Sequence, residues 1–276
     1  MKITHLRNAT IVVELGKYRI LLDPMLAPKG ALPALKFSDQ RQRNPIVELP
    51  LVTDTVLQTV THCLITHCQR GHFDHLDRAG KSWLRSRQIP IICTQHDAKY
   101  LRQRGLNVSA LPDDHRSPMA FLGGKITTVR CTHGRGMIGM LMEHGVGYFI
   151  ELPGEPSLFL AGDTILSDEI RSFLTRAQPQ ISVIPAGGAR FDFGTDIIMG
   201  IDEVIEFTGM SEGIVVANHL ESVSHCPVKR IALRAAAVRA GVADRLRIPE
   251  DGDTLEFAPQ SPKSSAERNG QSAFEM

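Results

Sequence analysis

Along the first third of the chain, apolar residues recur in some segments with the period of about 2 that is typical of strands, and in others with the period of about 3.6 that is typical of helices. Gly16 separates two apolar runs as a hairpin turn would, and Pro24 closes the second run. The pattern predicts strands at 10–14, 18–22, 62–66 and 89–93. It predicts helices at 77–87 and 95–104, so a β-α-β rhythm follows the hairpin.

The middle of the chain changes to consecutive strand-like runs with Gly or Pro between them, which favours antiparallel pairing. These runs predict strands at 125–130, 137–142, 147–152 and 157–161. The pair Pro153-Gly154 is a tight-turn signal between the last two runs.

Helical periodicity returns in the last third of the chain. A helix is predicted at 166–177 from the spacing of Ile170, Phe173, Leu174 and Ala177. Strands are expected at 181–185 and 213–217, with a short helix at 202–208. The last helix is expected at 227–240, with Pro227 in its first position, Gly241 at its end and an apolar face of Val228, Ile231, Ala235 and Val238.

Each half of this pattern begins with strands and ends with helices. We therefore expect an α/β fold, an αββα sandwich of two mixed β-sheets flanked by helices, as a single domain over 1–257. The proline-rich segment 25–50 predicts a long loop, which either covers a pocket or is a disordered surface insertion. The polar tail at 258–276 is expected to be disordered.

Composition excludes several classes of protein. The 276 residues are 42% apolar and 22% charged, with a formal net charge of +1, so we expect neither a nucleic-acid partner nor insertion into a membrane. No run reaches the roughly 20 apolar residues of a membrane span. The five cysteines are scattered and the N-terminus lacks a secretory pattern, so the predicted location is the cytoplasm, without a disulfide framework.

The strongest chemical signal follows the predicted strand at 62–66. His67, His72, Asp74 and His75 lie within nine residues, and imidazole and carboxylate are ligands that Zn²⁺ and similar cations prefer. The alternative is a loop of polar residues that bond to one another. One short loop supplies too few ligands for two cations, so other segments must contribute.

Candidates for those further ligands stand where other apolar runs end. His133 follows the run at 125–130, Asp163 follows 157–161, and His219 follows 213–217. His225 competes with His219, which we prefer because it directly follows its strand. We expect these strand ends to converge at one edge of the sandwich.

The order of these segments resembles the metallo-β-lactamase superfamily. That pattern is His-x-His-x-Asp-His, a lone His, an Asp in a Gly-Asp-Thr context such as Gly162-Asp163-Thr164, and a last His. The segments 22–24, 147–151, 161–164 and 184–188 resemble its ascorbate-phosphate-lactonase-like branch. The resemblance extends over about residues 1–257.

The chain departs from the superfamily pattern at one point. Four residues separate His67 from His72 where the family has one, which we interpret as a three-residue insertion that bulges outward and leaves both ligands in position. If the bulge displaced His67, the first cation would lose a ligand or Cys68 would replace it.

The resemblance implies a binuclear metallo-hydrolase. His67, His72 and His133 would hold one cation; Asp74, His75 and His219 would hold the other; Asp163 would bridge them. A metal-bound hydroxide, oriented by Asp74, would attack a lactone, ester or phosphodiester, and Asp74 and His219 are the catalytic candidates. Zn²⁺ is the first candidate for both cations, with Mn²⁺ or iron as alternatives.

Other residues are candidates for contact with a small-molecule substrate. Arg135, Arg190 and His225 are predicted to bind it, although a solvated arginine is an equally good interpretation of the first two. The alternative function is a metal-binding sensor or scaffold of the same fold without hydrolytic activity. The sequence leaves open the substrate, the native metal and whether the chain forms a homo-oligomer.

Overall fold

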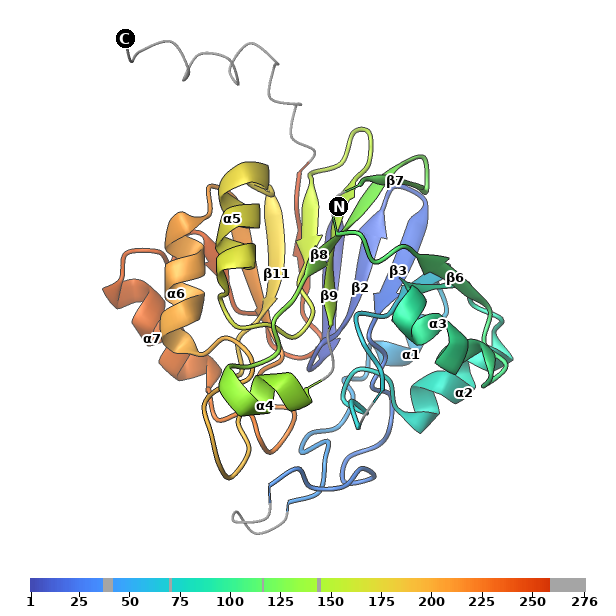
Figure 1. Cartoon of the computed structure of the whole chain (residues 1–276), viewed down its shortest axis with the longest axis horizontal. Helices are drawn as coiled ribbons and strands as arrows, with labels where there is room; N and C mark the ends of the chain where they lie inside the picture. The colour runs from blue at the N-terminus through green and yellow to red at the C-terminus, as the bar shows by residue number, and fades with distance from the viewer. Residues whose placement is uncertain (37–41, 70, 116, 143–144, 259–276) are drawn as a thin grey trace.

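A computed structural model of the chain describes residues 1–36, 42–69, 71–115, 117–142 and 145–258 (Figure 1). The predicted tail at 258–276 lies outside the described residues except for its first residue. Among the described residues, none of the helices has the length and hydrophobicity that a membrane span requires.

The described strands form two mixed sheets. The first sheet has the order β14 (Thr254–Glu256), β1 (Lys2–Arg7), β2 (Thr10–Leu15), β3 (Tyr18–Leu22), β4 (His62–Leu64), β5 (Ile91–Thr94) and β6 (Val108–Leu111). The second has the order β13 (Leu246–Arg247), β12 (Ile214–Asn218), β11 (Ile181–Pro185), β10 (Leu158–Leu160), β9 (Val146–Glu151), β8 (Gly124–Arg130) and β7 (Met119–Phe121). In each sheet one half pairs antiparallel and the other half parallel.

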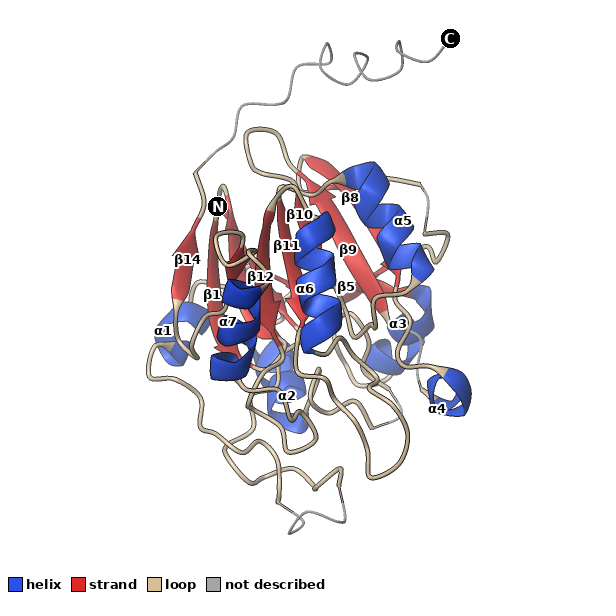
Figure 2. Ribbon diagram, turned by 90° about the vertical axis from the view of Figure 1, so that its left-hand side faces the viewer, coloured by secondary structure: helices blue, strands red, loops and turns tan. Residues whose placement is uncertain are grey.

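Helices cover the outer face of each sheet. The first sheet carries α1 (Thr53–Leu57), α2 (Arg78–Ser86) and α3 (Gln95–Arg102), and the second carries α5 (Asp168–Ala177), α6 (Ile201–Met210) and α7 (Arg230–Arg239). Figure 2 shows α5, α6 and α7 in front of the second sheet. The predicted αββα sandwich is therefore confirmed.

The core between the two sheets fixes how their edges align. Apolar residues of β2 and β3 pack against those of β9 and β10 in one buried cluster, among them Ile11, Ile20, Ile150 and Leu160. Tyr148 is fully buried there, and its hydroxyl donates a hydrogen bond to the backbone oxygen of Ile65 at 2.5 Å. This bond ties β9 to the segment that leads into the histidine cluster.

The prediction of a strand at 137–142 is wrong, because this segment forms helix α4 (Gly136–Leu141). Gly134 and Gly136 have φ of 89° and 58°, a left-handed backbone that turns the chain out of the sheet after β8. Gly139 then packs so close to Gly134 that a Cβ atom would lie 2.4 Å from the Gly134 oxygen. The apolar run consequently faces outward, with Met137, Met140 and Leu141 exposed.

The last helix begins later than predicted and buries a different face. Residues 227–229 precede α7, which starts at Arg230 rather than Pro227. Its buried face contains Arg230, Leu233, Ala236 and Ala237, whereas Ile231 and Val238 of the predicted apolar face are exposed. Arg230 can be buried on this face because its guanidinium pairs with Glu221 and Asp251 at 2.9 and 2.5 Å.

The described part of the loop at 25–50 is attached to the rest of the fold. The buried guanidinium of Arg7 donates to the backbone oxygens of Met25, Ala27 and Val47. The side-chain oxygen of Asn44 accepts the backbone N–H of Ser224 at 2.8 Å. These contacts hold the loop against the segment that follows His219.

Candidate metal centre

The side chains of the centre all follow carboxyl ends of strands. His67, His72, Asp74 and His75 follow β4, His133 follows β8, Asp163 follows β10, and His219 follows β12. Strands β8 and β10 are both antiparallel to β9, so they run in the same direction and end at the same edge. The topology thereby brings residues from distant parts of the sequence to one place.

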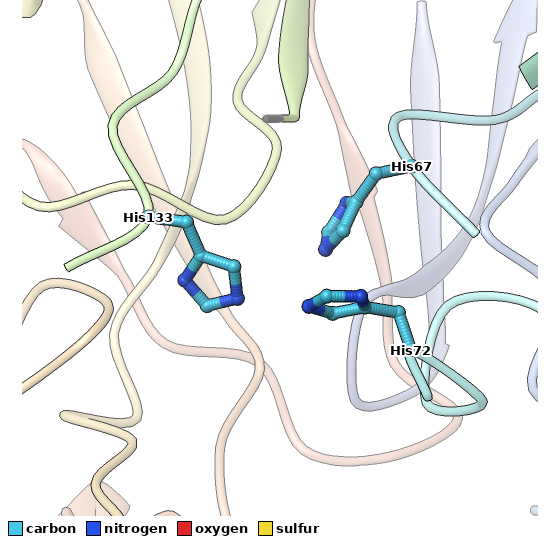
Figure 3. A group of neighbouring side chains, drawn as sticks. All are labelled: His67, His72 and His133. Atoms are coloured by element: carbon cyan, nitrogen blue, oxygen red, sulfur yellow. The ribbon is translucent and has the colours of Figure 1, made fainter. Parts of the chain in front are cut away.

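His67, His72 and His133 form the first group. One nitrogen from each lies within 4.8 Å of the others, and all three side chains are buried. Figure 3 shows the three imidazoles pointing toward one another, with His67 and His72 from one loop and His133 from another. The ring centroids of His67 and His72 are 4.4 Å apart, so the longer connection between them leaves both residues in the group.

Asp74, His75, Asp163 and His219 form the second group, with one ligand atom from each within 4.8 Å of the others. Asp163 links the two groups, because its Oδ2 lies 3.2 Å from His75 Nε2 and 3.5 Å from His133 Nε2. Its Oδ1 lies 3.6 Å from His219 Nε2. The structure thus brings together all seven residues that the sequence predicts as ligands, in the two predicted groups.

The outward-facing nitrogen of each imidazole is fixed by a neighbour. Nδ1 of His72 and Nδ1 of His133 contact the backbone oxygens of Gln69 and Ile197 at 2.7 and 2.9 Å. Nδ1 of His75 contacts Asp23 Oδ2 at 2.9 Å. A carbonyl or carboxylate oxygen only accepts, so each of these Nδ1 atoms carries a proton, and in the neutral imidazole Nε2 then presents its lone pair to the centre.

This arrangement fits divalent cations. Nε2 of His67 is buried and has no hydrogen-bond partner among the described residues, although an unpaired buried polar atom is costly. Neutral imidazoles combined with carboxylates form a donor set that suits zinc, manganese or iron. A cation between the Nε2 atoms would satisfy them.

Burial and charge act in opposite directions at the centre. Burial lowers the pKa of His67 and of His133, which keeps both imidazoles neutral. Burial also disfavours the charged form of His75, but the carboxylates of Asp163 and Asp23 outweigh it and raise its pKa well above the usual value. The carboxylates therefore attract positive charge, which protons or a divalent cation can supply.

Cys68 does not replace His67 in either group. Its side chain is buried in the apolar cluster that also contains Leu76 and Leu101. Cys131, two residues before His133, is likewise buried in the core under α5 and α6. Both thiols serve as small apolar side chains in this fold.

Two residues that support the centre were not singled out as site residues from the sequence. Asp23 accepts hydrogen bonds from Thr66 N and Thr66 Oγ1 as well as from His75. Asn8 donates to the backbone oxygen of Asp74 at 3.1 Å and lies 3.4 Å from His219 Nε2. No spacing rule points to them, because both precede the histidine cluster by dozens of residues; the signals for Asp23 are its position at the end of a strand and the resemblance of segment 22–24 to the ascorbate-phosphate-lactonase-like branch.

The predicted substrate-binding residues differ in their surroundings. Arg135 pairs with Glu203 at 2.7 Å and Arg190 with Asp196 at 3.2 Å, so each guanidinium already has a carboxylate partner in its own chain. His225 is buried, with its Nε2 4.0 Å from Asp74 Oδ2 and its ring parallel to that of Phe191. Binding of substrate by these three residues stays a prediction.

Buried imidazoles and carboxylates at the strand ends of an αββα sandwich define the class: the metal-dependent hydrolases of the metallo-β-lactamase fold. No protein-family model matches the chain. The sequence is nevertheless 32% identical over 262 residues to the UPF0173 protein YddR of Bacillus subtilis, a match that covers 93% of this chain and 100% of that protein. The chain belongs to the UPF0173 metal-dependent hydrolase family.

Two further comparisons agree with this assignment. A UPF0173 metal-dependent hydrolase of Methylacidiphilum infernorum is 28% identical over 205 residues, which cover 74% of this chain and 77% of that protein. Among solved structures, isothiocyanate hydrolase from Delia radicum gut bacteria is 30% identical and superposes with a TM-score of 0.83, over 93% of this chain and 99% of that one.

Proposed function

We propose that this chain is a hydrolase that works with two divalent cations. His67, His72 and His133 hold one, Asp74, His75 and His219 hold the other, and Asp163 is shared. The observation that carries the proposal is the common orientation of His72, His75 and His133, in which Nδ1 bonds to an acceptor and Nε2 is left for a cation. Zn²⁺ is the first candidate, and Mn²⁺ or iron are the alternatives.

The chemistry is hydrolysis by activated water. Such cations, when bound, lower the pKa of water toward about 7 and polarise the oxygen or other electron-rich atom of the substrate. Asp74 orients the attacking water, because its Oδ2 lies within 3.5 Å of His219 Nε2 and faces the same centre. His225 lies next to Asp74 and donates a hydrogen bond to the substrate or its leaving group through Nε2.

The substrate is a small electrophile. The resemblance found in the sequence suggests a lactone, ester or phosphodiester, whereas the isothiocyanate hydrolase at 30% identity adds an isothiocyanate to the candidates. The pairing of Arg135 and Arg190 with carboxylates of the same chain favours an uncharged substrate over a phosphodiester. We therefore rank isothiocyanates, lactones and esters ahead of phosphodiesters.

A metal-binding sensor or scaffold without turnover is the second candidate function. Its motivation was the insertion between His67 and His72, which would have disrupted the first group. Because both imidazoles lie in that group with His133, the insertion gives this alternative less support than a hydrolase has.

Metal content and turnover, measured on the same preparations, test the proposal. We expect two cations per wild-type chain, and at most one in Asp163→Ala, which removes the shared carboxylate. Asp168→Ala changes an exposed carboxylate in the first turn of α5 and should keep two. Retention of two cations by Asp163→Ala would contradict the shared role. Full metal content without turnover of any of the four substrate classes would favour the sensor or scaffold.

A further inference from the structure

A main-chain oxygen in the connection between His67 and His72 makes two contacts with His72. The backbone oxygen of Gln69 accepts the backbone N–H of His72 at 3.0 Å and lies 2.7 Å from His72 Nδ1. The orientation of the His72 ring therefore depends on where the peptide of Gln69 lies. Gly71, with φ of 93°, makes the turn that returns the chain to this oxygen.

The side chain of Gln69 is in turn bound to helix α3. Its Nε2 donates to Asp97 Oδ1 at 2.8 Å and to the backbone oxygen of His96 at 3.1 Å. Asp97 lies in the first turn of α3 and is 1% exposed, so its carboxylate is fixed by packing. The neighbouring Cys68 packs beneath the same helix, in the apolar cluster that contains Ala98 and Leu101.

We propose that Gln69 and Asp97 are positioning residues for the first cation. They fix the long connection between His67 and His72 so that both imidazoles can bind the same cation. Asp97 accepts a hydrogen bond from the Gln69 side-chain amide and so fixes the position of Gln69. The peptide oxygen of Gln69 is then in place to bond to His72 Nδ1, which directs His72 Nε2 toward His67 and His133. The inference rests on the proposed function, because it assumes that this group binds a cation.

The physical reason is the freedom of a longer loop. A connection of four residues between two ligands can adopt many more backbone conformations than a connection of one residue. Every conformation that moves His72 away from the first group weakens cation binding. The hydrogen bond from Gln69 to the buried carboxylate of Asp97, which we call the tether, excludes those conformations in the cation-free protein. His75 and His219 are held by Asp23 and Cys226 instead, so the second group does not depend on this tether.

The test is Zn²⁺ binding measured by competition with a chromophoric chelator, which resolves two dissociation constants. Gln69→Met keeps the length of the side chain and its peptide oxygen but removes the amide donor. Asp97→Ala removes the carboxylate acceptor but leaves the backbone oxygen of His96, whereas Asp97→Asn keeps a side-chain acceptor oxygen. Gln103→Met, at the far end of α3, is the matched control because its side chain is exposed.

We expect one of the two dissociation constants to rise by about tenfold or more in Gln69→Met and in Asp97→Ala, as for other residues that orient metal ligands. The other constant should stay at the wild-type value, and Asp97→Asn and Gln103→Met should retain both wild-type constants. Thermal unfolding of the chelator-treated proteins checks that the variants fold; if Asp97→Ala does not, Gln69→Met alone decides.

The outcomes separate this inference from the proposed function. Wild-type affinity for both cations in Gln69→Met would overturn the tether and leave the metal centre intact. An equal rise of both constants would also overturn it, because that is the result of a general loss of structure. A wild-type chain that binds no Zn²⁺, Mn²⁺ or iron would overturn the proposed function, and this inference with it.

Discussion

Replacement of Asp23 by asparagine should weaken the metal centre without touching a proposed ligand. Asp23 Oδ1 accepts Thr66 N at 2.8 Å, and its Oδ2 accepts the hydroxyl of Thr66 at 2.6 Å and faces His75 Nδ1 at 2.9 Å. Asparagine has nearly the same shape and tolerates the left-handed backbone of this position, whose φ is 42°. It keeps one acceptor oxygen but brings an NH₂ donor to the position of Oδ2.

That donor reverses the hydrogen bonds around it. His75 can then bond to the introduced amide only by accepting at Nδ1, which moves its proton to Nε2 and removes the lone pair from the centre. The hydroxyl of Thr66, no longer donating to the side chain at position 23, is free to donate to His67 Nδ1, which lies 3.0 Å away, and to reverse that imidazole too. Loss of such orienting partners costs about 10- to 100-fold in metal affinity, which is about 1.4–2.8 kcal/mol.

The assay is Zn²⁺ competition on Asp23→Asn beside Asp77→Asn. Asp77 is an equally buried carboxylate, but it accepts the backbone N–H groups of Ala27 and Gly80 and is not hydrogen-bonded to a histidine of the centre. Asp77→Asn should therefore lower stability and leave metal affinity unchanged. Wild-type affinity in Asp23→Asn, or an equal loss of affinity in both variants, would mean that Asp23 does not set the proton positions of His75 and His67.

Three further predictions concern stability. Tyr148→Phe should cost about 1–2 kcal/mol in urea unfolding, because it leaves the buried oxygen of Ile65 without its donor; no change would mean that the oxygen finds another partner. Removal of cations by a chelator should lower stability by about 2.7 kcal/mol for each bound cation, relative to protein at 100 times the dissociation constant, seen as a lower Tm; an unchanged Tm would argue against binding in the folded state. Burial lowers the pKa of His5, because it outweighs the attraction of Asp251. Below about pH 6.5 the unfolded chain therefore binds more protons at His5 than the folded chain does, and the contribution of His5 to the free energy of unfolding falls. The stability advantage of the wild type over His5→Gln should shrink in that range, and a constant difference would contradict the shift.

The arrangement of the centre could be predicted because each ligand obeys a rule that is visible in the sequence. His133, Asp163 and His219 each follow an apolar run, and strand ends that share a direction meet at one edge of a sheet. The order of the runs also predicted the two layers of sheet. The strand ends follow from the pattern, whereas the division of the ligands into two groups linked by Asp163 came from the resemblance to the metallo-β-lactamase superfamily.

Elements whose pattern is ambiguous were missed or misassigned. The apolar run at 137–142 matches a strand in composition, and only the left-handed glycines at 134 and 136 show why it leaves the sheet. The short strands β7, β13 and β14 have two or three residues, too few for an alternation to be detected. Their position depends on the neighbouring strand that supplies the hydrogen bonds.

The residues around the ligands could not be predicted because they act through contacts between distant segments. Asp23 reaches His75 across 52 positions, and Asn8 reaches His219 across 211. The buried face of α7 was mispredicted for a related reason. Arg230 lies on that face with its charge paired to Glu221 and Asp251, which lie outside the sequence pattern of the helix. Such pairings follow from the fold and have no periodic signal.

The proposed hydrolase requires that the two groups of buried side chains each hold a divalent cation. The most direct measurement is anomalous X-ray diffraction at the Zn absorption edge from crystals of the protein grown with Zn²⁺. We expect one peak among His67, His72 and His133 and a second among Asp74, His75 and His219, with Asp163 in contact with both. Peaks only at the surface of the protein, with none between these side chains, would contradict it.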